Sequence, residues 1–305
     1  MEKSRQHFVQ KKILSNFSNS PDRPYDKQTI WVHDKSSNDS FISNIKNIAV
    51  KKKFLEKNAD DVLTAIESEC YPALARIIDQ KCILCKKFGP REALENHIFL
   101  YRYVGHQLYR TPAYRRRIMN LPYWRGKNQE DLIKYQSNLF NKAKYVLIDF
   151  DLEGKNRAIP DEKRNMSKIY YETLVKLTKL KLNQSDDLAA SLFNVIQPII
   201  LVNKSNIPFY TNDVGLAWFF PFYKTINLIA DGYKIESWLV FPISPKVAIF
   251  LCTTKSTSIW ANSIEDDNRG MILDFQDEKT INLVNKNIKE LSERYVFSTI
   301  KIDSN

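Results

Sequence analysis

The pattern of apolar residues along the chain changes near Phe193, and this change constrains the fold more than any other feature. Before it, apolar residues recur at the three- and four-residue spacing of amphipathic helices; after it, β-branched and aromatic residues dominate in short runs. Helices followed by short strands indicate an α+β protein. We therefore predict a single domain over residues 1–305, in which a mainly helical part, 1–192, packs on a smaller antiparallel sheet within the mainly β part, 193–305.

The same patterns predict the individual elements. Helices are expected over residues 5–17, 60–79, 90–110, 112–119, 130–150 and 167–182, and again over 278–295. Strands are expected over residues 28–34, 193–202, 208–210, 238–242, 247–252 and 296–302, with a hairpin turn at 203–206 and a loop over 151–165.

Basic residues outnumber acidic ones by 46 to 35, so the formal net charge is +11. A surface with this balance attracts polyanions such as nucleic acid, anionic membranes or acidic proteins. A lysine-rich composition gives the same net charge without any binding site, because lysines scattered over the surface do not form a binding site. The chain has only 7 glycines and lacks both a P-loop and a dinucleotide-binding fingerprint, so these nucleotide folds are not expected.

Metal binding has two weak candidates in the sequence. Cys82 and Cys85 form one Cys-x-x-Cys pair, but Cys70, His97 and His106 do not supply the compact second half of a zinc site. Two buried thiols are therefore favoured over zinc. Asp149 and Asp151 suit a hard cation or an ordinary strand end. We assign no metal, and the cofactor stays unknown.

Two further features bear on the compartment. The chain has 4 cysteines, too few for a disulfide scaffold at this length. No run of apolar residues approaches the length of a membrane helix, and the first twenty or so residues lack the apolar core of a signal peptide. We therefore expect a cytoplasmic protein without a membrane partner.

A stretch over residues 96–129 contains no acidic residue and alternates basic with aromatic side chains. Its cations are Arg102, Arg110, Arg115, Arg116, Arg117, Arg125 and Lys127. Arginine neutralises phosphate through paired hydrogen bonds, and aromatic rings stack on unpaired bases. The stretch therefore predicts nucleic-acid contact, above all by Arg116, Arg117, Arg125 and Lys127. The alternative is a helix that buries its tyrosines and exposes its arginines to water.

Catalytic candidates are few and scattered along the sequence. His7 and Gln10 lie one helical turn apart, and Glu67 borders the apolar face of its helix. Each suits either acid–base chemistry or an ordinary structural hydrogen bond or ion pair. Asp213, in the turn Thr211-Asn212-Asp213, is either a carboxylate presented at a sheet edge or part of an Asx turn that caps its own backbone.

Four segments together resemble one bacterial family, domain of unknown function 4238. A pattern like His-x-Val-Pro-x-x-x-Leu-x-x-Phe is matched by His7, Val9, Leu14 and Phe17, with Gln10 in place of the proline. A pattern like Gln-x-x-Arg-Thr-Pro-x-x-Arg is matched by Gln107, Arg110, Thr111, Pro112 and Arg115. Phe-x-Thr-Ser-Asp-x-Pro is matched by Phe209, Thr211, Asn212 and Asp213, with Gly215 in place of the proline, and residues 241–245 resemble Phe-Pro-Leu-Ser-Pro. The resemblance implies no known reaction, but it suggests that these polar residues converge in one pocket.

We therefore expect a nuclease-like enzyme that acts on nucleic acid or a nucleotide, of the kind found in toxins and antiviral defence. The expected catalytic residues are His7, Glu67 and Asp213, and the expected substrate- or phosphate-binding residues are Gln10, Gln107, Arg110, Arg115, Thr211 and Asn212. Two alternatives stay open. One is a non-catalytic RNA- or DNA-binding module. The other is a protein-interaction subunit of a larger defence system, whose basic face meets an acidic protein or a second copy of the chain.

Overall fold

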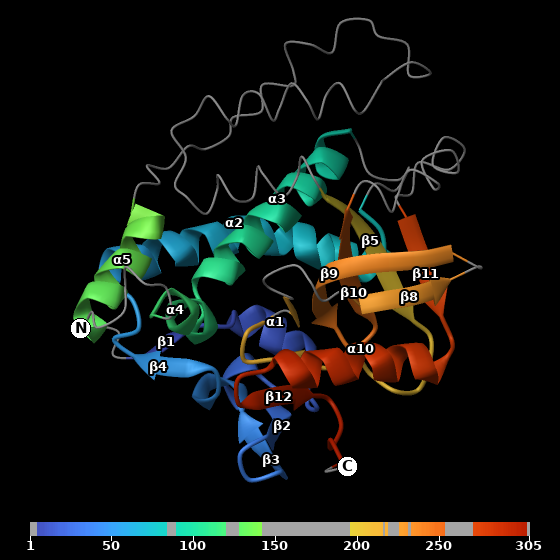
Figure 1. The fold of residues 1–305 in the computed structure, drawn as a ribbon, viewed down its shortest axis with the longest axis horizontal. Helices are drawn as coiled ribbons and strands as arrows, with labels where there is room; N and C mark the ends of the chain where they lie inside the picture. Colours follow the sequence, from blue (N-terminus) through green and yellow to red (C-terminus); the bar gives the residue numbers. More distant parts are fainter. Residues whose placement is uncertain are drawn as a thin grey trace, which may run out of the picture.

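The computed structural model describes residues 5–83, 90–119, 128–141, 196–215, 217–218, 226–230, 233–253 and 271–303. Within these ranges the chain is a mixed α+β protein whose helices and strands are interspersed (Figure 1). It contains a two-stranded, a four-stranded and a six-stranded sheet. The predicted α+β class is confirmed, but the predicted helical first two-thirds is wrong, because strands also build the N-terminal region.

The N-terminal strands belong to the two smaller sheets. β1 (Arg5–His7) pairs antiparallel with β4 (Val50–Lys52). β2 (Thr29–Asp34) and β3 (Asp39–Asn44) join β6 (Thr211–Asn212) and β12 (Tyr295–Ser298) in the order β3-β2-β12-β6. The predicted strands at 28–34 and 296–302 are thus present. Only residues 11–16 of the helix predicted at 5–17 are helical, and they form α1 (Lys11–Asn16). Residues 5–7 form β1 instead, because they pair with β4.

Four further helices follow the helical spacing of the sequence closely. They are α2 (Lys57–Gln80), α3 (Pro90–Tyr109), α4 (Pro112–Met119) and α5 (Gln129–Asn141). Pro90 and Pro112 each occupy the first helical position, where the missing N–H costs no hydrogen bond. α2 ends at Lys81 in the left-handed conformation, with φ of 54°. The predicted loop at 151–165 and helix at 167–182 lie outside the described residues, as does the end of the predicted helix at 130–150.

The six-stranded sheet has the order β11-β5-β10-β9-β7, with β8 also paired to β9. Its strands are β5 (Ile196–Asn203), β7 (Ala217–Trp218), β8 (Ile226–Ala230), β9 (Tyr233–Ser244), β10 (Val247–Thr253) and β11 (Met271–Phe275). The sheet is mixed rather than antiparallel, because β11 runs parallel to β5. Residues 208–210 are not a strand, and the turn after β5 does not close a hairpin, since the next strand, β6, belongs to another sheet.

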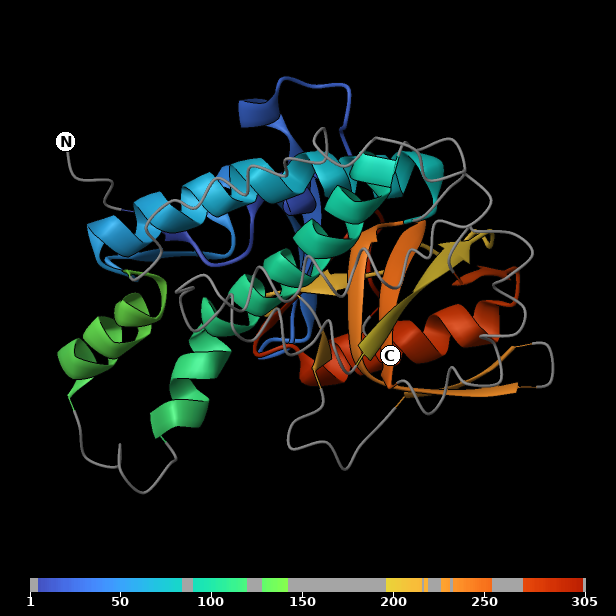
Figure 2. The same ribbon diagram turned by 90° about the horizontal axis from the view of Figure 1, so that it is seen from above.

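Helices cover both faces of this sheet (Figure 2). Alternate strand residues point to opposite faces, so neighbours such as Ile199 and Ile200 enter different cores. One core joins the sheet to α1, α2 and α3, and it includes the stacked rings of Tyr103 and Phe241, whose centroids are 5.3 Å apart. The other core joins the opposite face to α10 (Glu278–Leu291). The first of these cores packs α1 and α2 together beside the candidate site.

Candidate functional site

A pocket of about 390 Å³ lies between the N-terminal segment and α2. β1 and α1 supply most of one wall, while α2 supplies the carboxylates Asp60 and Glu67. His7 and Gln10 line the pocket, but they do not share a helix as expected, because His7 ends β1 and Gln10 is the N-cap of α1. The cations Arg5, Lys11 and Lys12 and the phenol of Tyr25 also line it. The pocket therefore combines a histidine, two carboxylates and three cations in one small cavity.

Arg110 connects two of these groups from behind the pocket. One terminal nitrogen of its guanidinium forms an ion pair with the Glu67 carboxylate, and the other donates to the main-chain oxygen of His7. The side chain is only 6% exposed. Burial lowers the pKa of Arg110 to about 10, so the guanidinium stays charged at neutral pH. Arg110 thus acts as a positioning group that fixes Glu67 beside the His7 backbone.

The His7 side chain is partly buried in the pocket wall. Burial, followed by the nearby Lys11 cation, lowers the pKa of His7 to about 4. Its Nε2 lies 3.4 Å from the main-chain oxygen of Ile45. The imidazole is therefore neutral at physiological pH, which is the state that accepts a proton in acid–base chemistry.

Gln107 anchors the N-terminal segment to the turn after β6. Its Nε2 donates to the main-chain oxygen of Phe8 at 2.9 Å and to that of Val214 at 3.3 Å. Gly215 adopts a φ of +78° directly against this amide. A Cβ atom on Gly215 would lie 2.7 Å from the Gln107 Nε2. Gln107 is therefore part of the support behind the pocket and is not among the pocket-lining residues.

Replacing Gly215 by alanine is expected to lower the free energy of unfolding by about 2 kcal/mol. The positive φ alone costs an L-residue about 1–2 kcal/mol, and the new methyl group would push Gln107 away from the Phe8 and Val214 oxygens. Urea denaturation of both proteins measures the difference. An unchanged midpoint would show that the Gln107 contacts do not stabilise the fold.

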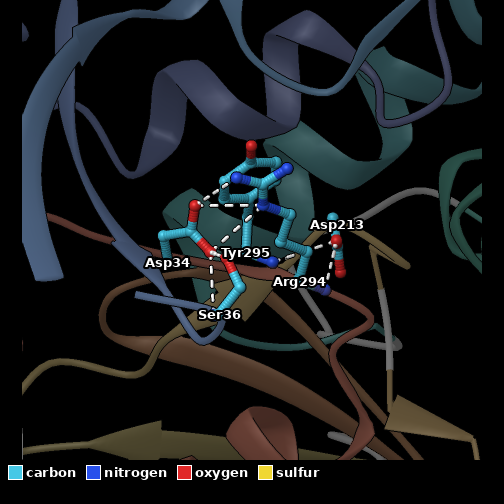
Figure 3. A network of polar contacts seen from close by, with 5 residues as sticks. All are labelled: Asp34, Ser36, Asp213, Arg294 and Tyr295. Atoms are coloured by element: carbon cyan, nitrogen blue, oxygen red, sulfur yellow. Dashed lines mark hydrogen bonds and ion pairs between the residues drawn. The ribbon is translucent and has the colours of Figure 1, made fainter. Parts of the chain in front are cut away.

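The turn Thr211-Asn212-Asp213 is engaged with the protein backbone. Asn212 accepts from the N–H of Val214 at 3.1 Å and donates to the oxygen of Ile288 at 3.0 Å. The Asp213 carboxylate accepts from the backbone N–H groups of residues 293, 294 and 295 at 2.8, 2.8 and 3.0 Å, and Figure 3 shows the contacts with Arg294 and Tyr295. Thr211 is buried in β6. The structure thus places this turn at the end of α10 and does not bring Asp213 together with His7 and Glu67.

The basic residues after Arg110 divide into separate environments. Arg115 is buried, donates to the main-chain oxygen of Phe54 at 2.6 Å and lies over the Phe54 ring at 4.3 Å. Arg116 is exposed and forms an ion pair with Glu293. The side chain of Arg117 and the whole of Arg125 and Lys127 lie outside what the structure describes. Arg115 therefore packs inside the protein, while Arg116 is at the surface.

The sequence reading missed a polar network beside Asp213. Arg294 makes three contacts of 2.7–3.1 Å with the Asp34 carboxylate, which also accepts from Ser36 (Figure 3). Arg294 and the hydrogen bonds from Ser36 hold the pKa of Asp34 well below its usual range. The network ties β2 to the segment that follows α10. Nothing in the spacing of Asp34 and Arg294, 260 residues apart, signals this pairing.

Cysteines and carboxylates give no metal centre within the described ranges. No group of three or more His, Cys, Asp or Glu side chains lies close enough to hold an ion there. Cys82 is disulfide-bonded, so the expectation of two thiols at Cys82 and Cys85 is wrong for Cys82, whereas Cys70 is a buried thiol. Cys85, Asp149 and Asp151 lie outside the described residues.

Comparison with known proteins gives a family and no function. Of the helices that the structure describes, none is both long and apolar enough to cross a membrane. Neither a curated protein nor a solved structure is significantly similar to the chain. The profile of a family described as a protein of unknown function (DUF4238) matches residues 5–301, which include the His7, Arg110 and Asp213 segments. The chain therefore belongs to the DUF4238 family.

Proposed function

We propose that the protein is a nuclease-like effector that binds and cleaves a phosphodiester of nucleic acid or of a nucleotide in the pocket between α1 and α2. The observation that carries the proposal is the composition of that pocket. A neutral His7 lies beside a Glu67 carboxylate fixed by Arg110, and the cations Arg5, Lys11 and Lys12 line the same cavity. Cations attract the phosphate, while a neutral imidazole accepts a proton from the attacking group.

The proposed step is a displacement at phosphorus. His7 takes the proton of the attacking hydroxyl, from water or from a ribose. The attacking oxygen bonds to phosphorus while the bond to the leaving oxygen breaks, and the leaving oxygen takes a proton from solvent. When water is the attacking group, Glu67, held in place by Arg110, orients it by accepting a hydrogen bond from its second hydrogen. The lysines offset the negative charge that builds on the phosphate oxygens.

Replacing His7 by glutamine is expected to lower the cleavage rate by about 100-fold, the usual contribution of a positioned general base. The measurement is turnover of a labelled single-stranded RNA by the purified chain.

Replacing Lys11 by glutamine is expected to weaken binding of the same RNA. It should also reduce the dependence of binding on salt by the equivalent of about one released counterion. Lys286→Gln, an exposed lysine on α10, is the matched control and should change neither. Salt-dependent binding without turnover would instead support the non-catalytic binding module.

The pH profile of cleavage gives an independent test. Since the pKa of His7 is lowered to about 4, the active neutral imidazole is retained far below the usual histidine range. We expect kcat/KM to stay level as the pH falls through 6.5 and to drop only as it approaches 4. An acidic limb centred near pH 6.5 would contradict the lowered pKa of His7, because it would report an imidazole with an ordinary pKa. A kcat/KM that stays level down to about pH 3 would contradict the assignment of His7 as the base.

A further inference from the structure

The side chain of Gln10 is buried but makes no hydrogen bond within the described part of the protein. Only 3% of the residue is exposed. It stands at the N-cap of α1, yet its side chain makes no capping bond. A buried carbonyl oxygen without a donor costs roughly 1–3 kcal/mol. Because Gln10 also lines the pocket, a ligand in the pocket is the natural source of the missing partners.

Two other buried glutamines of the N-terminal region, Gln6 and Gln28, behave differently, whereas the Gln107 side-chain oxygen, like that of Gln10, has no donor among the described residues. Gln6 both donates to the Leu55 oxygen at 2.9 Å and accepts from the Leu55 N–H at 2.7 Å. Gln28 accepts from the Ser15 hydroxyl and donates to the Pro21 oxygen at 3.1 Å. In both amides, the donor and the acceptor form hydrogen bonds within the protein. Unlike Gln107, Gln10 lines the pocket, so a ligand seated there can supply the partner that its amide lacks.

We infer that Gln10 is a specificity-determining residue that reads the edge of a nucleobase, with adenine as the preferred base. This inference rests on the proposed function. A carboxamide presents one donor and one acceptor side by side, and adenine offers the complementary pair at its N6 amino group and N7. Tyr25, which lines the same pocket and is 43% exposed, supplies an aromatic face on which a base stacks. Lys11 and Lys12 then contact the phosphate of the same nucleotide.

The inference predicts a base preference that depends on Gln10. The probes are fluorescent 12-residue strands of oligo(rA), oligo(rU) and an abasic ribose-phosphate polymer, bound to a chain carrying His7→Ala so that no strand is cleaved and no second carboxamide enters the pocket. The parent chain should bind oligo(rA) about 10-fold more tightly than oligo(rU), within the range of one bidentate base contact. Gln10→Met, which keeps the length of the side chain, should remove this preference and leave affinity for the abasic strand unchanged.

A second substitution guards against a folding artefact. Gln10 has a φ of −60°, which proline adopts without strain, and Gln10→Pro restores the residue of the family pattern. It should abolish the preference as Gln10→Met does. Equal binding of oligo(rA) and oligo(rU) by the parent chain, or a preference that survives both substitutions, would overturn the inference and leave the proposed function standing. Failure to bind all three strands would overturn the proposed function, and the inference with it.

Discussion

Replacing Arg110 by methionine is expected to lower the free energy of unfolding by about 3 kcal/mol, the lower end of the cost of breaking a buried ion pair. The guanidinium is 6% exposed and holds both the Glu67 carboxylate and the main-chain oxygen of His7. Methionine fills much of the volume of the arginine side chain. The loss of unfolding free energy therefore comes from the missing polar contacts and not from a new cavity. The substitution leaves Glu67, with 21% of its side chain exposed, without its cation. Urea denaturation followed by circular dichroism measures the change.

Two controls separate the buried pair from a general effect of charge. Removing the carboxylate as well, in Arg110→Met with Glu67→Gln, should recover about 1–2 kcal/mol, because no buried charge is then left unpaired. Lys204→Met breaks the ion pair with Asp274, in which both side chains are 48% exposed, and should cost less than about 1 kcal/mol. Equal losses for Arg110→Met and Lys204→Met would show that the buried pair stabilises the fold no more than an exposed pair does.

The same pair illustrates what the sequence could predict about the site. Glu67 stands out because a carboxylate borders the apolar face of a clearly periodic helix, and α2 forms as that spacing predicts. Arg110 stands out through its motif. The ion pair between Arg110 and Glu67 could not be predicted, because the two residues are 43 positions apart and meet only in the folded protein. Arg5, Lys11 and Lys12 were not singled out, because exposed cations in a basic chain look alike in sequence.

Local pattern also explains which elements were predictable. α10 follows its apolar spacing and begins at Asp277, whose carboxylate accepts from the N–H groups of Lys279 and Thr280. β10 and the second half of β9, residues 238–243, are apolar runs in the middle of a sheet. β1 and β6 have three and two residues and exist only because β4 and β12 pair with them. Strands this short carry no periodic signal, so β1 and β6 were not predicted, whereas β2 and β12 of the four-stranded sheet were.

Replacing Asp213 by alanine is expected to lower the free energy of unfolding by about 3 kcal/mol, because a buried carboxylate that accepts several hydrogen bonds is worth more than a neutral acceptor. Its two oxygens accept from three consecutive backbone N–H groups, at residues 293–295, and no other acceptor stands there among the contacts that the structure describes. The turn after α10 also carries Arg294, whose contact with Asp34 ties β2 to this segment. Loss of the carboxylate therefore loosens both contacts. Urea denaturation at neutral pH measures the effect.

The substitution Asp213→Asn distinguishes a structural role of Asp213 from a catalytic one. Asp213→Asn keeps the shape and one acceptor oxygen, so it should cost about 1–2 kcal/mol. Burial raises the pKa of Asp213, and the hydrogen bonds from the backbone N–H groups oppose that rise. Since Asp213 lies outside the pocket lining, turnover per folded molecule of Asp213→Asn should stay within about twofold of the parent chain, against the roughly 100-fold loss expected for His7→Gln. A large loss of turnover with unchanged unfolding would instead return Asp213 to the catalytic set.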